Sequence, residues 1–224
     1  MTRYWWKVLA VLILLYTIIA GLTIQIPMIG TNAESSRGLF FHVPMWIAMY
    51  TLFTISVVNS LLYLVKYDLK RDVAASSAAN VGTFFGVLGF ATGTLWATYT
   101  WGSTLPTDPK QMSTALALFI YMAYLVLRMS IQDIDKRARI SAVFNVFAFA
   151  LLIPLTYIIP RMVDSLHPGA GNTPGFSKDD TDHHMMMVFY PAMVGWALLG
   201  VWLYSLQMRY RKLELKNIFG NDRP

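Results

Sequence analysis

The 224-residue sequence contains no cysteine. Disulfide bonds, thiolate metal sites and thiol redox chemistry by this chain are therefore excluded. Charged residues are also scarce, at 13%, whereas 56% of the residues are hydrophobic and the mean hydropathy is +0.48. A soluble domain carries about a quarter charged residues, so this chain has too little polar surface to be covered by water. Lipid removes that requirement, and the composition therefore indicates an integral membrane protein.

Long runs without charge divide the chain into six candidate membrane-spanning segments. A helix needs about 20 apolar residues to cross about 30 Å of hydrocarbon. We therefore predict an all-α bundle in a single membrane domain over residues 1–224, with helices at approximately 8–29, 41–65, 74–98, 111–130, 140–160 and 185–208. The connecting loops leave no room for a soluble catalytic domain, so we expect a function on or within the membrane and not an enzyme.

The 18 basic residues are distributed unequally around these segments. Fourteen lie in the N-terminus, the loops after the second and fourth segments, and the C-terminal tail, while four lie in the other three loops. Cytoplasmic loops carry an excess of Lys and Arg, so we predict that both termini are cytoplasmic. Because the basic residues are topological signals spread over four regions, we do not expect binding to nucleic acid.

The four histidines all fall on the predicted outer side, at positions His42, His167, His183 and His184. Imidazole is the commonest metal ligand and a standard axial ligand of haem iron. His42 lies where the second helix begins, and His167 lies just beyond the fifth. The two residues are therefore candidates for a bis-histidine haem site if those helices approach one another. The alternative is that they are interfacial histidines that bind no metal.

His183 and His184 follow the acidic residues Asp179, Asp180 and Asp182. Adjacent histidines on a helix point in different directions and seldom bind one ion together. The cluster has the chemistry to bind a divalent cation, but a solvated acidic loop is the better interpretation.

Aromatic residues gather at the outer end of the third segment, at Trp96, Tyr99 and Trp101. Trp and Tyr are enriched at both interfaces of membrane proteins, and position alone favours this interpretation. The alternative is a flat apolar platform against which a porphyrin stacks.

Taken together, these segments resemble the haem exporter protein C (CcmC) family of cytochrome c maturation. This family belongs to a haem-handling group that is defined by a tryptophan-rich "WWD" loop. Residues 41–44 with Trp46 match the first-loop histidine motif, residues 101–110 match the tryptophan-rich loop, and the spacing from Pro154 to His167 matches the third-loop histidine. The resemblance covers nearly the whole chain.

One segment departs from the family pattern. The family loop reads approximately W-G-x-x-W-x-W-D, whereas residues 101–108 read WGSTLPTD. The two inner tryptophans are replaced, so the aromatic platform is thinner, while both histidines are present.

The resemblance implies a haem-binding role for His42, His167, Trp96, Trp101 and Asp108. The histidines would be axial ligands of a transiently and non-covalently held haem b, and the tryptophans would contact the ring. The acidic residue would close the loop. Haem propionates are anionic, and Lys110, a basic residue of this loop, is the first candidate to bind one.

The resemblance also implies partners and a location. The partners are a periplasmic haem chaperone (CcmE), an ABC-type ATPase with a second membrane subunit (CcmA- and CcmB-like), and a small single-span CcmD-like protein. The location is the bacterial inner membrane, with haem held on the periplasmic side.

Two other functions stay open at this stage. An ABC-type transporter permease that moves a solute is one, although the segments carry few of the ionisable residues that mark a substrate path. A structural subunit that has lost haem binding together with its tryptophans is the other.

Overall fold

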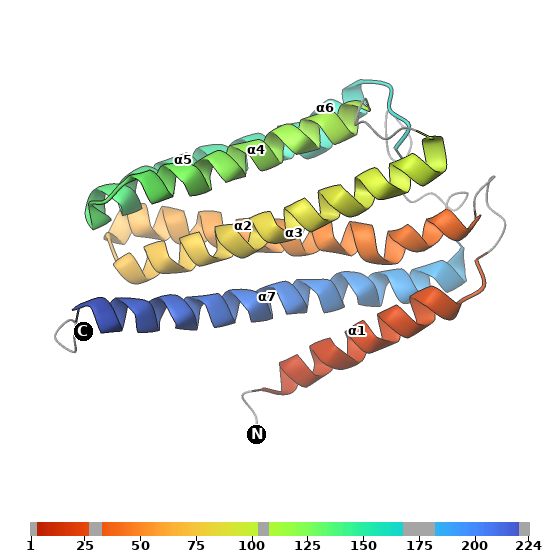
Figure 1. Ribbon diagram of the computed structural model, residues 1–224, viewed down its shortest axis with the longest axis horizontal. Helices are drawn as coiled ribbons and strands as arrows, with labels where there is room; N and C mark the ends of the chain where they lie inside the picture. The colour runs from red at the N-terminus through yellow and green to blue at the C-terminus, as the bar shows by residue number, and fades with distance from the viewer. Residues whose placement is uncertain (1–3, 27–32, 103–107, 168–181, 220–224) are drawn as a thin grey trace.

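A computed structural model describes residues 4–26, 33–102, 108–167 and 182–219, and every regular element in them is helical (Figure 1). The elements are α1 (Trp5–Thr23), a 3₁₀ helix η1 (Ala33–Gly38), α2 (Leu39–Lys66), α3 (Leu69–Trp101), α4 (Pro109–Ser130), α5 (Ile134–Ile153), a π-helical turn η2 (Pro154–Ile158), α6 (Ile159–Met162) and α7 (His183–Phe219). Within these described ranges, six helical stretches are long and apolar enough to cross a membrane, which confirms the predicted fold class.

Several helices, among them α3 and α7, continue beyond the apolar runs in the sequence. Asp68 accepts a hydrogen bond from the backbone N–H of Lys70 and caps the start of α3, whose first turn includes Asp72. At the other end of the chain, α7 continues through the basic residues Arg209, Arg211 and Lys212. Arg and Lys are good helix formers, so a helix persists after its charged residues have left the hydrocarbon.

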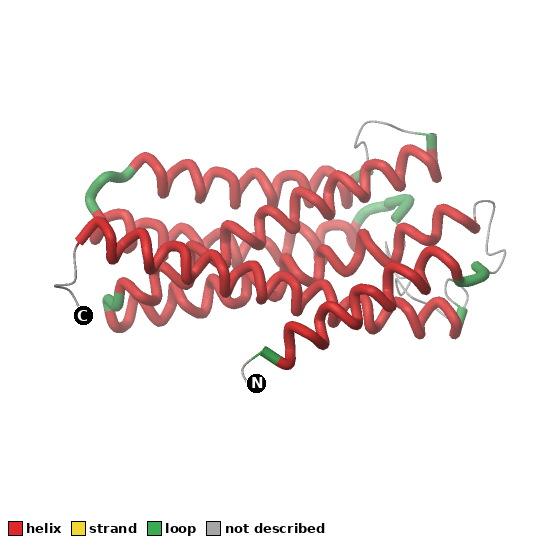
Figure 2. Tube along the Cα trace, turned by 60° about the horizontal axis from the view of Figure 1, so that its bottom comes forward, coloured by secondary structure: helices red, strands yellow, loops and turns green. Residues whose placement is uncertain are grey.

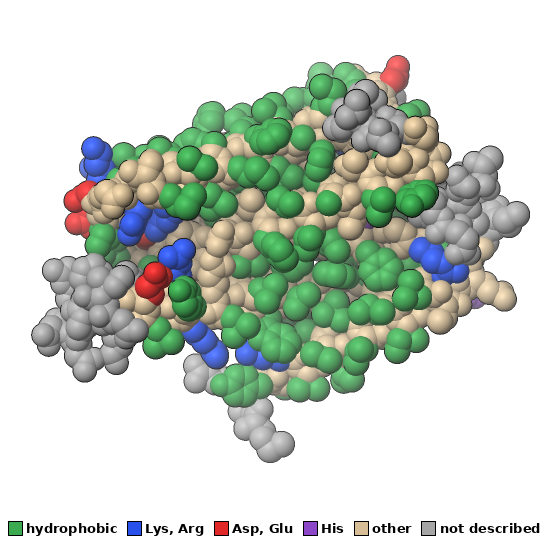
Figure 3. All heavy atoms as spheres, viewed as in Figure 1, with side chains coloured by type: hydrophobic (Ala, Val, Ile, Leu, Met, Phe, Trp, Pro, Cys, Tyr) green, Lys and Arg blue, Asp and Glu red, His purple; other side chains and the backbone are tan. Residues whose placement is uncertain are grey.

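The long helices lie side by side along the longest axis of the molecule. Contacts join α2 to α3, α5 and α7, while α1 packs on α7 at the outer edge of the bundle (Figures 1 and 2). Hydrophobic side chains cover the middle of the face seen in Figure 3, and most charged side chains lie toward its two ends. This distribution is that of a bundle surrounded by lipid.

The interface of α2 and α3 depends on glycine. Four glycines of α3 each face a large side chain of α2: Gly82 with Phe53, Gly86 with Met49, Gly89 with Trp46, and Gly93 with His42. Gly86 also faces Leu118 of α4. The three- or four-residue spacing of the four glycines places them on one helix face. Small residues let helix backbones approach closely in membranes. The large side chains of α2 therefore lie directly against the backbone of α3.

An ion pair joins α3 to α4 at the end of the bundle where α7 finishes. The guanidinium of Arg128 donates from Nη1 to Oδ1 of Asp72 at 2.7 Å and from Nη2 to Oδ2 at 2.5 Å. The two side chains are 16% and 7% exposed. Removing one member of such a pair leaves the other charge buried without compensation.

We predict that Arg128→Met lowers the free energy of unfolding by about 3–5 kcal/mol, because the Asp72 carboxylate then stays buried alone. The double variant Arg128→Met, Asp72→Asn should recover most of this loss. Equilibrium unfolding in detergent micelles measures both values. Equal losses in the single and double variants would contradict the explanation.

Candidate functional site

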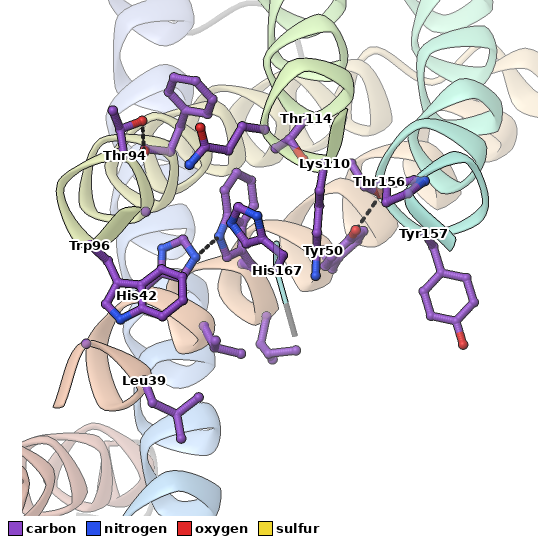
Figure 4. A pocket seen from close by; sticks show the side chains of 18 of the residues that line it. Leu39, His42, Tyr50, Thr94, Trp96, Lys110, Thr114, Thr156, Tyr157 and His167 are labelled. Atoms are coloured by element: carbon purple, nitrogen blue, oxygen red, sulfur yellow. Dashed lines mark hydrogen bonds between the residues drawn. The ribbon is translucent and has the colours of Figure 1, made fainter. Parts of the chain in front are cut away.

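A cavity of about 410 Å³ opens at the end of the bundle where α2 and α4 begin and α3 ends. This volume lies within the range of small-molecule pockets, about 300–1,000 Å³. Its lining includes four of the residues predicted from the sequence, His42, Trp96, Lys110 and His167 (Figure 4). Residues from four separate segments, α2, α3, α4 and the loop after α6, therefore meet in one largely apolar pocket.

His42 lies near the start of α2 and points into the cavity. Its ring rests against Gly93 of α3, where an added Cβ would overlap with the imidazole. Nδ1 lies 3.2 Å from Oγ1 of Thr92, and Nε2 lies 3.2 Å from the indole nitrogen of Trp46. Both ring nitrogens thus have defined neighbours, and the position of the ring is fixed by helix packing.

His167 follows α6 and is held among aromatic rings. The ring centroid of Trp101 lies 4.7 Å from that of His167 at an interplanar angle of 75°, and that of Trp96 lies 6.0 Å away. Trp96 lines the cavity, whereas Trp101 is outside its lining and packs behind the imidazole. Tyr99 is 73% exposed and contributes nothing to the cavity lining.

Asp108 connects the start of α4 to the loop that carries His167. Its Oδ1 caps the helix by accepting from the N–H of Lys110 at 2.9 Å, and lies 2.9 Å from Nδ1 of His167. Its Oδ2 accepts from the Ser165 hydroxyl at 2.7 Å and from the Leu166 N–H at 2.9 Å. One carboxylate therefore organises two segments that are far apart in the sequence.

The charge states of Asp108 and His167 follow from their surroundings. Burial alone would raise the pKa of Asp108, but hydrogen bonds from Ser165 and Leu166 outweigh it and hold the pKa below its usual value. Burial lowers the pKa of His167, and the charge of Lys110 adds to this, although Asp108 acts in the opposite direction. At neutral pH a neutral imidazole therefore donates from Nδ1 to an ionised carboxylate, and Nε2 keeps its lone pair.

The π-helical turn shapes another wall of the cavity, and it was not predicted. Its residues Thr156 and Tyr157 line the pocket. The Tyr50 hydroxyl donates to Oγ1 of Thr156 at 2.5 Å, which donates to the carbonyl of Leu152 at 2.5 Å. Pro154, which has no N–H, begins this π-helical turn. Single π-helical turns within α-helices are frequent at functional sites.

Other lining residues could have been recognised from spacing. Trp46 and Tyr50 follow His42 at intervals of four residues and so share its face of α2. Gln111 is 7% exposed and also lines the cavity. Within the described part of the chain its Nε2 meets no acceptor, so a donor is available to a ligand.

The outer basic residues have different positions. Lys110 and Arg161 line the cavity, and the Arg161 guanidinium lies 4.1 Å from the ring centroid of Tyr157. Arg37 instead donates to the carbonyls of Gly21 and Ile24 at the end of α1.

The acidic cluster before α7 has no metal-binding geometry among the described residues. His184 is exposed, with Nδ1 3.3 Å from Oδ2 of Asp182. Asp179 and Asp180 lie outside the described residues. The ranges that the structure describes contain no group of three or more His, Asp or Glu able to hold a metal.

Comparison with known proteins identifies the family. Residues 1–218 match the profile of "Heme exporter protein C" (CcmC). The chain belongs to this family. Proteins with this description from Rhodobacter capsulatus and Escherichia coli K12 are 22% identical over 190 and 178 residues, which cover 77% and 71% of those proteins and 85% and 80% of this chain. The family consists of membrane proteins for haem export rather than enzymes, as the sequence predicts.

A shorter match extends to Paracoccus denitrificans. The heme exporter protein C of this organism is 25% identical over 132 residues, or 59% of this chain. The matched region spans about half of that relative, 55% of its length.

We predict that Asp108→Asn loosens the loop around His167, because the new amide group opposes donors such as the Leu166 N–H. Loss of a hydrogen bond to a charged group costs about 1.5–3 kcal/mol, which corresponds to about 10- to 100-fold faster amide exchange. Hydrogen–deuterium exchange of peptides covering residues 163–167 measures the effect. Asp133→Asn, which alters the cap of α5, should leave this loop unchanged.

The same contact predicts a pH dependence. Since the folded state lowers the pKa of Asp108, its carboxylate stabilises the loop above the ordinary Asp pKa of about 4. This stability is lost as the pH falls through the lowered value. The protection factor at residues 163–167, which is the intrinsic amide exchange rate divided by the measured rate at each pH, should therefore fall in acid for the wild type and stay nearly constant for Asp108→Asn.

Proposed function

We propose that this chain is a membrane component of cytochrome c maturation that holds haem at its outer face and presents it to a periplasmic haem chaperone. One observation carries the proposal. Two imidazoles from separate segments, His42 and His167, line one apolar cavity together with the cationic residues Lys110 and Arg161. This combination suits a flat, apolar, iron-centred molecule with anionic propionates.

The two histidines are the proposed axial ligands. The hydrogen bond between Nδ1 of His167 and Asp108 supports this role, because a ligating imidazole commonly donates its other N–H to a carboxylate. Such a partner fixes the tautomer and increases the basicity of the ligand. The ring of His42 is held in place by two residues of α3, Thr92 and Gly93.

The other predicted residues have supporting roles. Trp96 contributes an apolar ring surface to the cavity, while Trp101 packs against His167 and supports the proposed ligand. Lys110 is the first candidate to bind a propionate, since an ammonium and a carboxylate form a strong charge-assisted hydrogen bond. Gln111 adds a second donor beside it.

The proposed orientation places the pocket on the periplasmic side of a bacterial inner membrane. The basic residues of the predicted cytoplasmic regions, including Arg128 and Arg209–Lys212, belong to the opposite end of the bundle. Haem held there would lie on the same side of the membrane as a periplasmic chaperone such as CcmE. An ABC-type ATPase, a second membrane subunit and a small single-span protein complete the proposed assembly.

We predict that His42→Ala or His167→Ala alone converts the six-coordinate haem spectrum of the purified protein into a five-coordinate one, because one axial ligand is lost. The double variant should lose the bis-histidine spectrum and bind haem about 100-fold more weakly or worse. Optical titration with haem measures both effects.

His183→Ala and His184→Ala are matched controls, since His184 is exposed beside Asp182 and neither residue lines the cavity. Both should leave the spectrum unchanged. An unchanged spectrum in the His42→Ala, His167→Ala double variant would refute the assignment of the ligands.

A further inference from the structure

The hydrogen bonds of His42 determine which of its nitrogens carries the proton. The Thr92 hydroxyl donates to the carbonyls of Leu88 at 2.9 Å and Gly89 at 3.0 Å, so its oxygen is left to accept from Nδ1 of His42. An indole N–H is only a donor. The Trp46 indole, 3.2 Å from Nε2, therefore requires that Nε2 be unprotonated. Both contacts specify the same tautomer.

A histidine that binds a metal through Nε2 needs this tautomer, but the lone pair of Nε2 already accepts a hydrogen bond from Trp46. Iron binds an imidazole through the unprotonated nitrogen, and here that nitrogen accepts from Trp46 (dashed line at His42 in Figure 4). An indole and an iron atom cannot share one lone pair. Haem binding through His42 must therefore break the hydrogen bond to Trp46.

The Trp46 side chain is held in a position to compete. It lies one turn after His42 on α2, with ring centroids 5.9 Å apart in an edge-on arrangement. Its ring packs against Gly89, where an added Cβ would lie 3.0 Å from Cε2 of Trp46. It also lines the cavity, so it is adjacent to the space that haem would enter.

We propose that Trp46 is an exchange partner of His42, which takes the place of haem iron on Nε2 when haem leaves. This inference rests on the proposed haem ligation by His42. The exchange keeps Nε2 hydrogen-bonded in the empty protein and so reduces the net affinity for haem. A protein that passes haem on benefits from such a ligand, because release does not leave a buried nitrogen unsatisfied.

The two proposed ligands thereby differ in strength. Nδ1 of His167 is paired with a carboxylate, which increases the basicity of Nε2. Nδ1 of His42 is paired with a neutral hydroxyl, and its Nε2 is engaged by Trp46. We infer that His167 is the stronger ligand and that His42 is the one exchanged.

The test is haem affinity in Trp46→Phe, which keeps an aromatic ring but removes the indole N–H. Affinity should rise about fivefold, the change expected when one neutral hydrogen bond no longer has to be broken. In the His42→Ala background the same substitution should produce no rise. This dependence on His42 separates competition for Nε2 from a change in packing against the porphyrin.

Trp196→Phe is the matched control. Its indole nitrogen is buried without an acceptor in the described part of the chain, and the residue packs on Phe85 outside the cavity lining. This variant should bind haem as the wild type does. Unchanged or weaker binding by Trp46→Phe would overturn the inference, as would an equal rise in the His42→Ala background.

A measurement on the wild type keeps the inference testable if Trp46→Phe does not fold. Ultraviolet resonance Raman spectroscopy reports hydrogen bonding of indole N–H groups, and added haem should shift one indole to the unbonded position. If haem binds through two histidines and no indole signal shifts, the proposed role of Trp46 is wrong, while the proposed function stands. If His42→Ala, His167→Ala leaves the haem spectrum unchanged, the proposed function itself fails.

Discussion

The close contact between α2 and α3 is the constraint on which the other features depend. Glycines on one face of α3 admit large side chains of α2, and the last of these pairs is Gly93 with His42. The packing that joins the helices therefore also sets the position of an imidazole at the cavity. A side chain at Gly93 would occupy the space of that ring. Fold and site are coupled at this point because the same interface forms both.

The second imidazole is fixed by a different kind of interaction. His167 belongs to a loop, where helix packing is not available to hold it, and a carboxylate takes over this task. Asp108 directly precedes α4, and its oxygens are shared between the cap of that helix and the loop that carries His167. Burial of this group is tolerated because its oxygens accept several hydrogen bonds. The pocket thus combines one histidine position set by van der Waals packing with another set by electrostatics.

The sequence predicts the helices well because the length of an apolar run and the charges at its ends carry most of the required information. The convergence of His42, Trp96, Lys110 and His167 follows from the family resemblance and not from periodicity. Periodicity identifies the face on which a residue lies but not the helix that it meets. For this reason the contact between Asp108 and His167 and the binding of Arg37 to the end of α1 were not predicted.

Two further structural features leave a signal in the sequence. The glycine spacing in α3 is visible in the sequence and indicates a close helix contact. The π-helical turn is harder to predict, because prolines such as Pro154 within an apolar run indicate a disturbed helix without specifying its form. The position of Trp101 behind His167 depends on how the end of α3 approaches the loop, and that approach is a property of the whole bundle.

The thinner aromatic loop gains a physical interpretation from this arrangement. Trp96 and Trp101, the tryptophans that remain, are the ones that contact the imidazole of His167. Their retention preserves the surroundings of the proposed ligand His167, while the replaced tryptophans would leave less aromatic surface to cover a haem ring. Apolar ring contact contributes affinity that must be overcome on release, whereas ligand placement determines where haem is held. If the site binds haem as proposed, keeping the ligand placement while reducing the ring contact would favour transient over permanent binding. The proposed exchange of Trp46 with haem iron on His42 would act in the same direction, because it too would lower the free-energy cost of releasing haem.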